Sequence, residues 1–152
     1  MKIENQVCTL KQAKKLKALG VAQESFMYWE ELHPVKDCAT ERLQVHFNTG
    51  HPISNGVVKD QYSAYTVAEL GEMFPLTFIY EDDKCFASSE KFCLSHKWIT
   101  GICTVASPNK SIEAKKYFAD HFEAHARAQN IIYLLEKGIV TVDTVNNNLL
   151  TL

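Results

Sequence analysis

The pattern of apolar and polar residues near the amino terminus predicts a short amphipathic helix. Thr9 and Gln12 stand at the spacing of a capping box, in which the two side chains satisfy the first free backbone N–H groups. We expect the helix to run over Leu10–Leu19 and to end at Gly20 in the left-handed conformation. At 100° per residue one side is mostly apolar, and the other side is basic. Three lysines lie on this basic side: Lys11, Lys14 and Lys15.

Several short runs in the middle of the chain have the alternation and aromatic content of β-strands. The predicted strands are Ser25–Leu32, Arg42–Phe47, Leu76–Tyr80, Cys85–Ser88 and one or two within Phe92–Val105. The first two are separated by a segment that suits an antiparallel return, and Glu81–Lys84 is a turn. Asn48–Gln61 is rich in turn residues and predicts a long loop. Gly101 marks a bulge in the last run.

Two further helices are predicted. A second capping box at Thr66 and Glu69 starts a short helix that ends at Met73. The longest periodic segment, Ile112–Lys137, contains no proline or glycine and predicts one long helix that Gly138 ends. The remaining tail, residues 139–152, contains a short strand or a helical turn.

Together these elements predict an α+β fold. We expect one domain over residues 1–152, with an antiparallel sheet covered on one face by helices, including the long C-terminal helix. No proline-rich, serine-rich or single-charge linker divides the chain. The open face of such a sheet would be a partner site or a dimer interface if aromatic side chains line it.

Composition narrows the class of protein. The net charge of −2 argues against a dedicated nucleic-acid coat, and 46% hydrophobic residues argue against disorder. No apolar stretch reaches the roughly 18 residues that span a bilayer, and the first residues lack the apolar core of a secretory signal. The chain has five cysteines, an odd number with no C-x-x-C pair: Cys8, Cys38, Cys85, Cys93 and Cys103. The simplest interpretation is that they are reduced thiols in a cytoplasmic protein.

His121 and His125 are the first candidate for chemistry. On one long helix the two imidazoles share a face, which is the geometry that a metal ion needs. The zinc-protease motif, however, has glutamate directly after the first histidine, where this chain has Phe122. Glu123 points to another side and is predicted to pair with Arg127 four residues later. The alternative is that both histidines are buried and hydrogen-bonded in the core.

The other candidates are less specific. Cys93 and His96 could form one pair of metal ligands, but a second close pair is missing. Any cysteine could meet a histidine in the folded chain, and nothing local marks one as an activated nucleophile. Phosphate-binding glycine loops are absent from the sequence. The lysines at positions 11, 14 and 15 are either a solvated helix face or a contact for phosphate or for an acidic partner.

Three segments together resemble a group of small uncharacterised proteins from phages and mobile elements of gut bacteria. They are Thr9–Gly20, Thr66–Met73 and the run from Glu123 to Gly138. The resemblance implies a small cytosolic α+β protein with an "EADARA"-like helix start near the carboxyl end. This chain has His125 where that phrase has aspartate. The resemblance implies no activity.

The leading hypothesis is therefore a non-enzymatic binding or accessory protein of a phage or mobile element that acts through protein contacts or self-association, without a cofactor. One alternative is a metal-binding protein or hydrolase that uses His121 and His125. Another is a nucleic-acid-binding accessory protein that uses the basic N-terminal helix.

Overall fold

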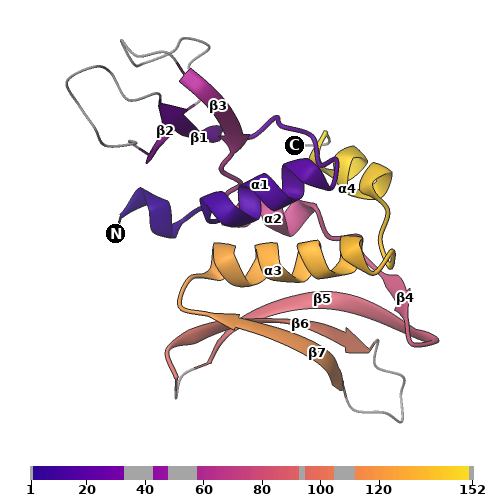
Figure 1. Cartoon of the computed structure of the whole chain (residues 1–152). Helices are drawn as coiled ribbons and strands as arrows, with labels where there is room; N and C mark the ends of the chain where they lie inside the picture. Colours follow the sequence, from indigo (N-terminus) through magenta and orange to yellow (C-terminus); the bar gives the residue numbers. More distant parts are fainter. Residues whose placement is uncertain (1, 33–42, 48–57, 93–94, 105–111, 151–152) are drawn as a thin grey trace.

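The computed structural model describes residues 2–32, 43–47, 58–92, 95–104 and 112–150 (Figure 1). The helices in these parts are η1 (Ile3–Asn5), α1 (Leu10–Ala18), α2 (Val67–Glu72), α3 (Glu123–Glu136) and α4 (Val142–Leu149). The strands are β1 (Met27–Leu32), β2 (Leu43–Phe47), β3 (Val58–Ser63), β4 (Phe78–Tyr80), β5 (Asp83–Phe92), β6 (Lys97–Thr104) and β7 (Ala114–Asp120). None of these helices is long and apolar enough to cross a membrane.

The described strands form two antiparallel sheets. The smaller sheet has the order β2-β1-β3 and the larger has the order β4-β5-β6-β7. Helix α3 lies along one face of the larger sheet, and α1 and α2 lie on the far side of α3 (Figure 1). One cluster of buried residues joins the helices to both sheets. The predicted α+β class, with helices on one face of an antiparallel sheet, is confirmed.

The two capping boxes are confirmed. Thr9 and Gln12 exchange both bonds at the start of α1, and Thr66 and Glu69 do the same at α2. Gly20 follows the end of α1 with φ of 92°, as the left-handed stop requires. Glu69 is almost fully buried. Its Oε1, the carboxylate oxygen that the capping box does not use, accepts the backbone N–H of Phe26 at 3.0 Å. The same residue therefore starts α2 and holds the beginning of β1.

Most predicted strands are present with shifted ends. The return from β1 to β2 is antiparallel, as is the return from β4 to β5. The predicted loop Asn48–Gln61 is wrong at its end, because Val58–Gln61 belongs to β3, which pairs with β1. The bulge predicted at Gly101 occurs one step later, between Ile102 and Cys103. Arg42, Val105 and residues 48–57 lie outside the described residues.

The single long helix over Ile112–Lys137 is wrong. Residues 114–120 form β7, which pairs with β6, and α3 begins only at Glu123. Residues 114–120 form a strand and not a helix because their backbone groups can hydrogen-bond to β6. The aromatic side chains of Tyr117 and Phe118 also favour a strand. The second half of the prediction is confirmed: α3 has 14 residues, ends before Gly138, and carries the expected Glu123–Arg127 ion pair at 2.6 Å.

The tail after α3 forms a helix, which is one of the two structures predicted for it. Asn146 of α4 joins this helix to the loop after α1. Its side chain accepts the N–H of Ala22 at 2.8 Å and donates to the carbonyl of Gly20 at 3.2 Å. These bonds fix the last helix against the first.

Asn130 in α3 has a very different environment. The residue is fully buried, and neither atom of its amide has a hydrogen-bond partner within the described part of the chain. A buried amide without partners loses its bonds to water and gains nothing in return. Asn130 is therefore a local cost to the stability of the fold.

We expect Asn130→Leu to raise the free energy of unfolding by about 1–3 kcal/mol, because it removes this desolvation cost at similar volume. Urea denaturation measures the change. The matched control is Asn146→Leu, which loses two hydrogen bonds and should lower the free energy of unfolding by about 1–2 kcal/mol. A loss of stability in the Asn130 variant would contradict the prediction.

Candidate functional site

A groove of about 740 Å³ opens between α1 and α3. This volume lies in the range of small-ligand sites, which is about 300–1,000 Å³. The residues that line the groove are Thr9, Lys11, Gln12, Lys14, Lys15, Ala18, Asp120, Gln129 and Ile132. We call it the α1–α3 groove.

One wall of the α1–α3 groove is basic. Lys11, Lys14 and Lys15 follow one another at helical spacing and so lie on the same side of α1. Lys15 forms an ion pair of 2.6 Å with Glu136 of α3, and both side chains are about half exposed. Such an exposed pair is worth little and can exchange partners. The structure thus brings the three lysines selected from the sequence to one groove.

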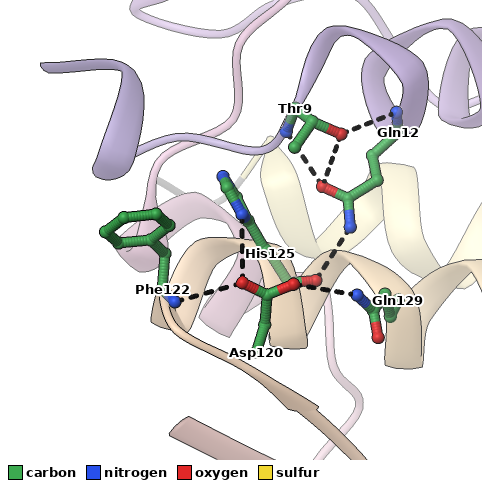
Figure 2. A network of polar contacts seen from close by, with 6 residues as sticks. All are labelled: Thr9, Gln12, Asp120, Phe122, His125 and Gln129. Atoms are coloured by element: carbon green, nitrogen blue, oxygen red, sulfur yellow. Dashed lines mark hydrogen bonds and ion pairs between the residues drawn. The ribbon is translucent and has the colours of Figure 1, made fainter. Parts of the chain in front are cut away.

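The opposite wall is organised by Asp120, the last residue of β7 (Figure 2). Its Oδ1 accepts the backbone N–H of Phe122 at 3.2 Å and lies 3.3 Å from Nδ1 of His125. Its Oδ2 accepts Nε2 of Gln129 at 3.3 Å. The carboxylate stands at the start of α3, where the helix dipole favours a negative charge. Asp120 therefore fixes both the helix start and the groove wall.

Gln12 connects the two walls (Figure 2). Its Oε1 accepts the N–H of Thr9 at 2.9 Å in the capping box, and its Nε2 donates to the carbonyl of His125 at 2.9 Å. One side chain thus closes the first turn of α1 and binds the backbone of α3. This contact sets the spacing between the helices at the end of the groove where Asp120 lies.

The two histidines are in different places. His121 is exposed in the turn before α3, so the predicted sharing of one helix face is wrong. The side chain of His125 is only 14% exposed and lies edge-on to Phe122, with 5.1 Å between ring centroids. Its Nε2 is buried, has no hydrogen-bond partner in the described residues, and the ring does not line the groove. His125 therefore supports Asp120 and does not face a ligand.

The residues that the structure describes contain no assembled metal site, and their thiols are buried. Nowhere in them do three or more His, Cys, Asp or Glu side chains come close enough to hold a metal ion. Cys8, Cys85 and Cys103 are buried free thiols. Burial raises the pKa of Cys8 to about 12 and also raises the pKa of Cys85. Cys38 and Cys93 lie outside the described residues.

Asp120 and Gln129 are groove residues that the sequence did not single out. Asp120 stands three residues before Glu123, the first residue of α3, and its carboxylate accepts the N–H of the N-cap residue Phe122. No local signal singled it out, because it lies inside the segment predicted as one continuous helix. Gln129 carries no local signal, because a half-buried glutamine in a helix is ordinary.

No protein-family model, no curated protein and no solved structure matches this chain.

We expect Cys8 to resist alkylation in the folded protein. With a pKa of about 12, roughly one thiol in ten thousand is ionised at pH 8, and burial blocks the reagent. Iodoacetamide labelling at pH 8, followed by peptide mass spectrometry, should modify Cys8 in urea and leave it intact without urea. Rapid labelling of Cys8 in the native protein would contradict this.

We expect Asp120→Ala to lower the free energy of unfolding by about 1–3 kcal/mol, because three donors lose their acceptor. Asp120→Asn keeps a carbonyl oxygen and loses mainly the charge at the helix start, so its cost should be about 0.5–1 kcal/mol. Urea denaturation of both variants tests the network. Two equal costs would mean that the hydrogen bonds at Oδ1 and Oδ2 contribute nothing.

Proposed function

We propose that this chain is a non-enzymatic binding protein that accepts an acidic segment of a partner protein in the α1–α3 groove. The observation that carries the proposal is the meeting of Lys11 and Lys15 on one wall with the Asp120 network on the other. Lys14 also lines this wall, and its Nζ lies 5.1 Å from the centre of the Tyr62 ring. Acidic side chains of the segment would face the lysines. Apolar contact would come from Ala18 and Ile132, which also line the groove.

The spacing of the lysines defines the shape of the segment. Lys11 and Lys15 are four residues apart, which places them about 6 Å apart along the helix axis. In an extended chain, residues two apart are separated by about 6.6 Å and point to the same side. An extended segment with acidic residues at alternate positions therefore matches this wall. The nine residues of α1 span about 14 Å, or about four extended residues.

The composition of the opposite wall favours a peptide over a nucleic acid. Asp120 has about four acceptor sites, three of which are occupied, so its carboxylate can accept one more N–H from a peptide backbone. Phosphate groups carry no such N–H donors, so they cannot satisfy this acceptor. The whole chain also has a net charge of −2, so it lacks the broad positive field of a nucleic-acid-binding protein.

A binding role also fits the lack of an imidazole or a thiol among the residues that line the groove. The imidazole of His125 is turned away from it, and the described thiols are buried. We include in the proposal that the protein acts in the cytoplasm, which the free thiols support, and that its partner belongs to a phage or mobile element. The second point is supported only by the sequence resemblance.

We expect a fluorescent peptide of alternating glutamate and threonine to bind the chain more tightly than a peptide of the same composition with its glutamates grouped. Fluorescence anisotropy at low salt measures both, and added salt should weaken the binding because the contacts are ionic. The double variant Lys11→Gln and Lys15→Gln should raise the Kd by about tenfold or more.

The matched control is Lys17→Gln. Lys17 is on the same helix, but it does not line the groove, and its Nζ donates to the backbone carbonyl of Gln61. This variant should change the Kd by less than about twofold. Equal binding of both peptides, or tighter binding of a single-stranded oligonucleotide than of either peptide, would overturn the proposal.

A further inference from the structure

We propose that the face of the larger sheet turned away from α3 is the contact surface for a second copy of this chain. It is a different surface from the α1–α3 groove, and it is supported by different residues.

The strand register identifies this face. Tyr80 of β4 and Phe118 of β7 both contact Tyr133 of α3, so their side of the sheet is the inner one. Residues next to them along each strand point to the other side. Paired residues share a side, so Gly101 and Tyr117 lie together on the outer side, as do Ile99 and Ala119. We call this side the outer sheet face.

The outer sheet face carries large apolar side chains in contact with solvent. Ile79 is 63% exposed, Tyr117 is 67% exposed and Phe92 is 43% exposed. Phe86 and Ile99 lie on the same side and are half-buried. Between them, β5 and β6 contribute the small residues Ser88 and Gly101, which pair with each other. Exposed apolar side chains of this size are what protein interfaces bury.

The charges on this face suit a second copy. Lys84 and Glu90 of β5 are both exposed and both lie on the outer side, and Lys97 of β6, which pairs with Phe92, lies on the same side and is half-buried. A two-fold contact brings the same surface together from both chains, so each residue type must find its complement on the same face. The presence of both signs on one strand allows the lysine of one copy to meet the glutamate of the other.

The plane of the face is about half the area that one partner buries in a standard interface. Four strands about 4.8 Å apart and about seven residues long cover a plane of about 440 Å². Side chains that stand out from this plane bring its accessible area towards the roughly 800 Å² per partner of a standard interface. Two sheets that meet in this way stack face to face about 10 Å apart.

The edges of the sheet are less suited to association. β4 has only three residues, and β7 carries two adjacent lysines, Lys115 and Lys116. Short strands and lysines are the means by which sheets avoid edge-to-edge pairing. Association through the outer sheet face is therefore favoured over the addition of a strand at either edge.

Sedimentation velocity of the full chain over a range of concentrations tests the proposal. We expect the wild type to shift with rising concentration to a species of twice the 17.2 kDa chain mass. Ile79→Lys and Tyr117→Lys, singly and together, should raise the dimer Kd by about tenfold or more, because each places a charge at an exposed apolar position of the contact. Circular dichroism and urea denaturation confirm that the variants are folded.

Leu76→Lys and Phe26→Lys are the matched controls. Both wild-type residues are large, apolar and exposed, at 95% and 65%, but neither belongs to the strands of the larger sheet. They should leave the dimer Kd unchanged. A wild type that stays monomeric at all concentrations would overturn the proposal. So would a dimer that survives both outer-face substitutions, because it would place the contact on another surface of the chain.

Discussion

Helix α3 is packed on two opposite sides, and the rest of the structure depends on this. One side lies against β6 and β7, and the other lies against α1 and α2 (Figure 1). A helix between two layers has little surface left for polar groups, so its buried positions are mostly small or apolar. Three fully buried alanines, Ala124, Ala126 and Ala128, let the neighbours approach closely. The guanidinium of Arg127 fills the space beside Gly71 of α2, where an added Cβ would lie 2.6 Å from its Nη1.

The parts of the fold that could be predicted from the sequence are those determined by residues close together in the chain. Capping boxes act within four residues, so Thr9 with Gln12 and Thr66 with Glu69 predicted their helices correctly. β7 was missed because periodicity over Ile112–Lys137 suits a helix as well as a strand followed by a helix. What decides between them is the backbone of β6, a partner that is distant in sequence. Local patterns cannot contain that information.

One wall of the α1–α3 groove could be predicted from the sequence, and the other could not. The lysine wall follows from helical spacing alone, so Lys11, Lys14 and Lys15 could be selected from the sequence. The other wall needs Asp120 at the end of a strand and Gln129 on a helix, and it forms only because the chain reverses between them. His125 was selected from the sequence as a metal ligand. In the structure its Nδ1 contacts the Asp120 carboxylate, and its Nε2 is buried without a partner in the described residues. A site that forms where a strand meets a helix can be predicted from the sequence only if the boundary between the strand and the helix is predicted correctly.

The two proposed surfaces lie on opposite sides of α3, and this has a consequence for how they would work together. α1 and the groove are on one side of the helix, and the larger sheet with its outer face is on the other. Two copies joined through their outer sheet faces would therefore present their grooves outward, without blocking either one. A partner with two acidic segments, or one that is itself dimeric, would bind such a pair with a second step that is intramolecular. The weak contacts expected of exposed lysines would then add to a stable complex, because avidity multiplies affinities that are each modest.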